Sequence, residues 1–262
     1  MTADSIDDYR RRNEDAPRHL VREAWRPVIR LIDGWAKEKI GMRSGYSSQE
    51  LDEFSQTHRV HFPPTLREWW RLAGRHPFVE VGLLPDNSML LAPHDHWLVT
   101  CRNFLMIAVD DVQTWSGNGI HADFLSEPDP QIHGINGITD CDGSPALPWY
   151  KDKYIATGLR VPTLVFTTLL YHLFEPSPLV RDDAVHLEDG RDPLLHGERR
   201  PDERLVSTLE LKHVPNDTMV GDIYSDGLDI IYFWLFGWAC RTEEAANRVR
   251  QLAPLPLQPR RF

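Results

Sequence analysis

Apolar residues that recur at intervals of three and four positions predict five amphipathic helices along the chain. These helices cover residues 18–39, a segment beginning near Gln49, the segment from Pro63 to Gly74, residues 163–174 and residues 242–252. Ser47 or Ser48 can cap the second helix and Thr242 the last, because an N-cap hydroxyl accepts a free backbone N–H group. We expect Gly74 to end the third helix in a left-handed conformation.

Short apolar runs separated by turn residues predict β-strands in the middle and near the end of the chain. The runs are residues 79–84, 89–91, 97–100, 104–109, 114–115, 132–138, 206–213 and 230–239. Strands that follow strands, with helices before and after them, are typical of the α+β class. We therefore expect a twisted, mainly antiparallel sheet flanked by N-terminal, middle and C-terminal helices.

The charge pattern along the chain predicts its domain organisation. Residues 1–16 are rich in charge and lack apolar periodicity, which predicts a flexible leader. Residues 17–255 are expected to form a single domain, and residues 256–262 a proline-containing tail. Within that domain, residues 175–204 hold nine acidic and five basic residues among Pro and Gly, so we expect a charged, exposed loop there.

Composition narrows the class of protein. The chain has 262 residues, 41% of them hydrophobic, which is enough for a globular core without disulfides or metals. Cys101, Cys141 and Cys240 lie far apart and form no disulfide or metal-binding pattern. The charged N-terminus lacks the apolar stretch of a secretory signal, and the most apolar run, residues 230–240, is about half the ~20 residues that span a bilayer. We therefore expect a cytoplasmic protein.

Several of these segments occur in an order found in a known family. Phe62-Pro63 opens a helix that ends at Gly74, a strand at 104–111 ends in an acidic pair, and Trp115 follows. This pattern, over residues 18–175, resembles the SUKH superfamily, which includes bacterial immunity proteins and a fungal cell-wall-synthesis regulator. The resemblance implies a protein-binding module, commonly an antidote to a cognate toxin, rather than an enzyme. A regulatory or scaffold module of the cell-wall-regulator kind is the alternative.

Negative charge is concentrated in two stretches. The chain carries 39 acidic and 29 basic residues, a surplus that disfavours nucleic acid or an anionic membrane as the main partner. Residues 103–150 contain seven acidic residues and residues 213–240 contain four, without Lys or Arg in either stretch. Segregated charge of this kind steers a basic protein partner, such as a nuclease toxin. The alternative is that many of these Asp residues form turns.

The predicted contact surface combines carboxylates for steering with one aromatic anchor. Its residues are Asp110, Asp111, Trp115, Asp123, Asp222 and Asp226.

Motifs for catalysis or cofactor binding are scarce. The chain lacks the GxSxG, HExxH, GxxxxGK[ST] and GxGxxG patterns, so we expect no catalytic residue and no cofactor. His94 and His96 flank Asp95 and would share a face of a strand, where two imidazoles and a carboxylate suit zinc or iron. No third strong ligand is evident from the sequence, and a His-rich loop is the alternative. A His-dependent metalloenzyme is the least favoured of the functions considered.

Overall fold

The computed structural model describes residues 21–79, 89–94, 104–111, 116–135, 154–171, 173, 180–187, 203–214, 223–233 and 237–252. These residues form helices and two antiparallel sheets, which confirms the predicted α+β class. None of the helices in this described part is long and apolar enough to cross a membrane.

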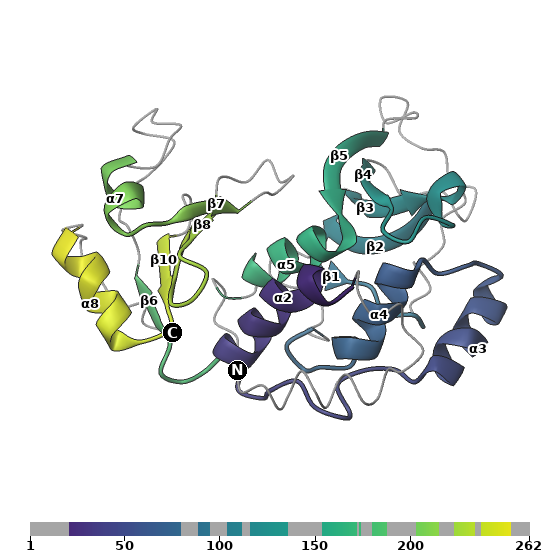
Figure 1. Ribbon diagram of the computed structural model, residues 1–262, viewed down its shortest axis with the longest axis horizontal. Coiled ribbons are helices and arrows are strands. Elements are labelled where there is room, and N and C mark those ends of the chain that lie inside the picture. Colours follow the sequence, from purple (N-terminus) through teal and green to yellow (C-terminus); the bar gives the residue numbers. More distant parts are fainter. Residues whose placement is uncertain are drawn as a thin grey trace. The chain divides into compact units, whose positions relative to one another are not determined.

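The chain divides into two compact units, each containing one five-stranded sheet (Figure 1). The first unit comprises Met1–Ile29 and Ile40–Leu169, and the second comprises Arg30–Lys39 and Leu170–Phe262. The sequence predicts one domain over residues 17–255 built on one sheet. Apolar runs identify strands but not their neighbours, because pairing joins residues that are distant in sequence, so the pattern did not separate the two sheets.

The first unit contains an antiparallel meander in the strand order β1-β2-β3-β4-β5. Its strands are β1 (Met89–Leu90), β2 (Phe104–Asp111), β3 (Ser116–His121), β4 (Gln131–Ile135) and β5 (Tyr154–Arg160). The meander was predicted, but strand β5 was not, because its residues show no clear apolar alternation.

Helices precede and follow this sheet in the chain, and one short helix lies between two of its strands. They are α2 (Val21–Trp35), α3 (Ser48–His58), α4 (Pro64–Ala73), the short 3₁₀ helix η1 (Ala122–Phe124) and α5 (Val161–Tyr171). The division between the units falls within α2 and within α5. Trp25 of α2 stacks on Trp69 of α4 with ring centroids 5.3 Å apart, and both rings are buried. The apolar stripes predicted from the sequence therefore form the core of this unit.

The ends of α3 and α4 depend on specific residues. Ser47 caps α3: its hydroxyl accepts the Glu50 N–H at 3.2 Å, while the Glu50 carboxylate accepts the Ser47 N–H at 2.8 Å. This is the reciprocal capping box of helix N-termini. Gly74 ends α4 in a right-handed conformation, not the left-handed one predicted. Glycine is needed there for space, because a Cβ atom would lie 2.9 Å from the Trp70 backbone.

The second unit contains strands in the order β6-β10-β9-β8-β7. Its elements are β6 (Val185–Leu187), α7 (Glu203–Thr208), β7 (Lys212–Val214), β8 (Ile223–Ser225), β9 (Ile230–Phe233), β10 (Gly237–Cys240) and α8 (Glu243–Leu252). Tyr224, Tyr232 and Trp238 are directly opposed on adjacent strands, and α8 packs on the same core through Ala245, Ala246 and Val249. Thr242 caps α8, as predicted.

Three sequence predictions in this unit need correction. The segment 175–204 was expected to be an exposed loop, but it contains strand β6, in which Leu187 is buried against β10. Residues 206–213 were expected to form one strand, yet they contain the end of α7 and the start of β7, joined through Glu210 at φ 55°. Residues 230–239 form two paired strands, β9 and β10, instead of one. Apolar content alone did not reveal where these elements begin and end.

Candidate protein-binding site

Five aromatic rings gather on one face of the first unit's sheet, and we call them the aromatic cluster. Its members are Phe104, His121, Phe124, His133 and Tyr154. The ring centroids of contacting members lie between 5.0 Å apart, for Phe104 and His121, and 6.2 Å apart, for His121 and Phe124. His121 stacks on Tyr154 and Phe124 stacks on His133, whereas Phe104 meets its neighbours edge-on. These are the favourable geometries of aromatic pairs.

The register of the meander brings the cluster together. Directly opposed pairs are Phe104 and His121, Gly119 and His133, and Ile135 and Tyr154. Residues two apart on a strand point to the same face, so all these positions share one side of the sheet. Phe124 arrives from η1, which follows β3 directly. The cluster therefore depends on pairings between four strands and on one short helix.

Gly119 leaves room beside the cluster. A Cβ atom at this position would lie 3.0 Å from the Met106 sulfur and 3.1 Å from Cδ1 of Ile135. Both of these side chains are buried. A larger residue in the middle of β3 would push them apart and disturb the register on which the cluster depends.

His133, like Phe104, is a buried member of the cluster, with only 7% of its surface exposed. Burial lowers the pKa of this imidazole, and the nearby His121 acts in the same direction. The neutral ring is therefore favoured in the folded state. A neutral imidazole stacks on Phe124 without the cost of desolvating a charge.

The outer part of the cluster is open to solvent and carries a carboxylate. Phe124 is 37% exposed and Tyr154 is 53% exposed. Asp123 is exposed beside them: its N–H group donates to Nδ1 of His121 at 3.3 Å, and its carboxylate lies 3.4 Å from the same nitrogen. Exposed aromatic side chains next to a carboxylate suit contact with another protein, with the rings as anchors and the charge as a guide.

The structure describes less of the other predicted contact residues of the first unit. Asp110 and Asp111 end strand β2, and Asp111 is opposed to Ser116 of β3. The side chains of Asp110 and Asp111 lie outside the described residues, as does the whole of Trp115. Of the predicted surface, Asp123 is thus the residue that the structure joins to an exposed aromatic patch.

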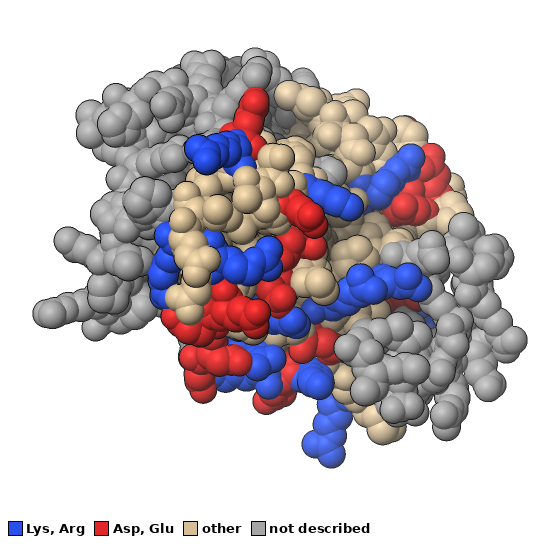
Figure 2. Space-filling view, turned by 60° about the vertical axis from the view of Figure 1, so that its left-hand side comes forward, with Lys and Arg blue, Asp and Glu red and all other residues tan. Residues whose placement is uncertain are grey.

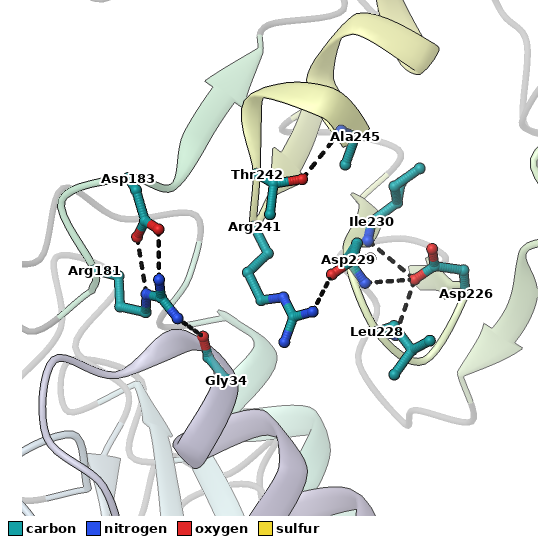
Figure 3. A network of polar contacts seen from close by, with 10 residues as sticks. All are labelled: Gly34, Arg181, Asp183, Asp226, Leu228, Asp229, Ile230, Arg241, Thr242 and Ala245. Atoms are coloured by element: carbon teal, nitrogen blue, oxygen red, sulfur yellow. Dashed lines mark hydrogen bonds and ion pairs between the residues drawn. The ribbon is translucent and has the colours of Figure 1, made fainter. Parts of the chain in front are cut away.

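Asp226 lies in the second unit, where it shapes the turn between β8 and β9 (Figure 3). One oxygen of its carboxylate accepts the N–H groups of Leu228, Asp229 and Ile230 at 2.9, 2.9 and 3.0 Å. This is the turn-forming role that the sequence left open as the alternative for these Asp residues. Asp222 lies outside the described residues.

Nearby carboxylates of the second unit are paired with arginines (Figure 3). Asp229 lies 2.5 Å from the Arg241 guanidinium, and Asp183 accepts two hydrogen bonds from Arg181 at 2.8 and 2.5 Å. Arg181 also donates to the carbonyl of Gly34 near the end of α2, at 3.4 Å. Figure 2 shows basic side chains beside acidic ones over the described part of the face that it draws. Ion pairs with arginines thus neutralise some of the carboxylates of this unit.

Comparison with known proteins gives no family. No protein-family model, curated protein or solved structure matches the chain. The SUKH resemblance therefore stays a prediction.

The described residues contain no group of three or more metal-ligating side chains. His94 is placed by Tyr46, whose hydroxyl lies 3.1 Å from the His94 Nδ1 atom, and by the nearby ring of Phe54. Asp95 and His96 lie outside the described residues.

Burial raises the pKa of the Cys240 thiol to about 12, which keeps this side chain protonated and unreactive at neutral pH.

Sequence reasoning missed most of the aromatic cluster. His121, Phe124, His133 and Tyr154 were not among the predicted contact residues. The dipeptide Asn136-Gly137 after β4 is a turn signal, and it could have pointed to an antiparallel partner for β4 such as β5. No local pattern, however, shows that rings from five elements converge.

Proposed function

We propose that this chain is a cytoplasmic, immunity-type binding protein. It neutralises a basic toxin domain, such as a nuclease, by covering it rather than by chemistry. The observation that carries this proposal is the open side of the aromatic cluster, where exposed Phe124 and Tyr154 lie beside the Asp123 carboxylate. The resemblance to SUKH proteins supports the same function.

Exposed aromatic side chains favour a protein partner. Tyr is among the residues enriched at the centres of protein interfaces, because its ring buries a large area at a low cost in side-chain entropy. The buried His133 and Phe104 hold the exposed rings of the cluster in place. A surface ordered before binding loses less entropy when the partner arrives.

The charges near the cluster favour a basic partner. Among the described residues, no Lys or Arg forms an ion pair with Asp123. The nearby Nδ1 atom of His121 accepts the Asp123 N–H group, so it carries no proton that could balance the carboxylate. Glu127 differs, because it lies 3.8 Å from Arg160. An unbalanced carboxylate beside exposed rings attracts Lys and Arg side chains and speeds association at low salt.

The proposal is tested by co-expression of the chain in a bacterial host with toxin-like domains encoded beside its gene. We expect growth to recover and the two proteins to elute as one complex. Asp123→Lys should weaken the complex at least tenfold and reduce its salt dependence, whereas Glu53→Lys, the same charge change on exposed α3, should leave it unchanged. Persistent growth arrest, or the absence of any such neighbouring gene, would overturn the proposal and favour a regulatory or scaffold module.

A further inference from the structure

Among the strands that the structure describes, β5 forms one edge of the first unit's sheet, where it pairs with β4 alone. Its first three residues, Tyr154, Ile155 and Ala156, are all exposed, and the exposed fraction is 53% for Tyr154 and 66% for Ile155. Natural proteins protect exposed edge strands with charged side chains, proline or bulges, because an open edge binds other strands. These three residues include no charged residue and no proline.

The second half of β5, in contrast, is protected. The register between β4 and β5 is irregular here. Gln131 lies opposite Arg160 and His133 lies opposite Ala156, so two residues along β4 correspond to four residues along β5. This bulge contains Gly158 at φ 79°. The Thr157 hydroxyl donates to the carbonyl of Ile132 and accepts the Leu159 N–H group, both at 3.0 Å. Bulges interrupt a regular ladder of backbone hydrogen bonds, so the open edge is limited to residues 154–156.

We propose that residues 154–156 bind an extended segment of the partner as a sixth strand of this sheet, and that this segment carries Lys or Arg toward Asp123. The inference rests on the proposed function and specifies how the partner is recognised. Added strands gain affinity from backbone hydrogen bonds and specificity from side chains that alternate between the two faces. Tyr154 would contact the segment on the cluster face and Ile155 on the opposite face.

Charge favours a basic segment over a second copy of this chain. Tyr154 stacks on His121, and the Asp123 carboxylate lies 3.4 Å from that same imidazole, so the carboxylate is close to the open edge. Pairing of two β5 strands would bring two such carboxylates together on chains that each carry a net charge of −10. A Lys or Arg on the added strand would instead meet a carboxylate without a Lys or Arg partner among the described residues.

The test uses blocked octapeptides of alternating Val and Thr in which two residues are replaced by Lys or, in a matched peptide, by Glu. Binding to the full-length chain is measured by fluorescence polarisation, and protection of the β5 amides by hydrogen exchange. We expect the Lys peptide to bind at least tenfold more tightly than the Glu peptide at low salt and to protect residues 154–156. Methylation of alternate peptide nitrogens, which removes backbone donors, should weaken binding at least tenfold.

Two variants of the chain control this experiment. Ile155→Lys should weaken binding of the Lys peptide at least tenfold, because it places a positive charge on the open edge. Leu228→Lys makes the same change at a side chain that is 58% exposed in the second unit, and it should have no effect. Circular dichroism and thermal unfolding show whether both variants fold as the parent does.

Several results would overturn strand addition: no binding of the Lys peptide, equal binding of the methylated peptide, insensitivity to Ile155→Lys, or a dimer of the chain that protects the same amides. If the toxin complex tolerates Ile155→Lys but not Asp123→Lys, the proposed function stands and strand addition fails. If the peptide binds at β5 while no toxin is neutralised, the edge site stands and the immunity function fails.

Discussion

The imidazole of His133 lies nearly parallel to the phenyl ring of Phe124, with ring centroids 5.8 Å apart and planes inclined by 11°. This contact joins a buried residue of β4 to an exposed residue of η1. It holds η1 against the sheet, so the position of Asp123 depends on the state of a histidine in the following strand.

Folding stability should therefore fall as the pH is lowered. Burial depresses the pKa of His133 in the folded state from the ordinary value of 6.5, so the unfolded chain takes up this proton first. The stability associated with neutral His133 is complete above pH 6.5 and is lost as the pH falls below it. The free energy of unfolding, measured with denaturant at pH 7.5 and 5.5, should fall less between these pH values for His133→Gln than for the parent chain.

The exposed His213 of β7 provides the control, because His213→Gln removes a histidine from the second unit. This variant should keep the pH dependence of the parent. If the free energy of unfolding depends equally on pH in the parent and in His133→Gln, His133 is not the cause of the pH dependence.

Ser47→Ala should destabilise the first unit by about 1 kcal/mol, the usual cost of losing an N-cap side chain. The hydrogen bonds from the Ser47 backbone and side chain, together with Arg75, lower the pKa of Glu50 to about 2. The stability that Glu50 contributes is present above its ordinary pKa of 4.5 and is lost as the pH falls toward 2. Urea unfolding at pH 7 measures the change. Ser48→Ala, one position inside the helix, should change stability by less than about 0.5 kcal/mol.

Asp226→Ala should destabilise the second unit by about 1–3 kcal/mol, because three backbone N–H groups lose their charged acceptor. Asp226→Asn keeps an oxygen at the same place and should retain most of the stability. Asp182→Ala removes an exposed ion pair with Lys37 and should cost less than about 1 kcal/mol. Thermal unfolding distinguishes the three variants. An Asp226→Ala protein as stable as the parent would show that the turn does not need the carboxylate.

Gly45→Ala should be among the most damaging small changes in the first unit. A Cβ atom there would lie 1.8 Å from the carbonyl oxygen of Arg71 and would separate the loop from α4, including the bond from Tyr46 N–H to the Trp70 carbonyl. We expect a loss of more than about 3 kcal/mol. Gly227→Ala places its Cβ in open space at φ 80° and should cost about 1–2 kcal/mol. If Gly45→Ala and Gly227→Ala lose similar amounts of stability, crowding at Gly45 is not the cause.

The predictable part of this fold is the part that local patterns determine. The stripe of Trp69 and Leu66 on α4, the cap at Ser47 and the strand at 104–109 follow from spacing and side-chain chemistry within about a dozen residues. Strand β5 and the split of the segment 206–213 do not, because their conformations depend on partners elsewhere in the chain.

The same distinction applies to the candidate site. The sequence could locate Asp123 in a stretch without Lys or Arg, since charge is counted along the chain. It could not show that the Asp226 carboxylate accepts backbone N–H groups of its own turn, or that Tyr154 lies against His121. The first depends on turn geometry and the second on strand register. Side-chain composition is therefore the basis of the proposed class of partner, and the fold is the basis of the proposed place where it binds.

The interleaving of the two units has a consequence for synthesis on the ribosome. Residues Arg30–Lys39 are made before Ile40–Leu169, yet they belong to the second unit, in which Gly34 accepts a hydrogen bond from a residue 147 positions later. At ordinary elongation rates that partner follows on the order of ten seconds later. The first unit has all its residues once Leu169 has emerged, whereas the second waits for β10, the strand to which β6 and β9 pair. During this interval, the side chains of Leu31, Ile32 and Trp35, which are buried in the folded chain, lack the second-unit residues that have yet to be made.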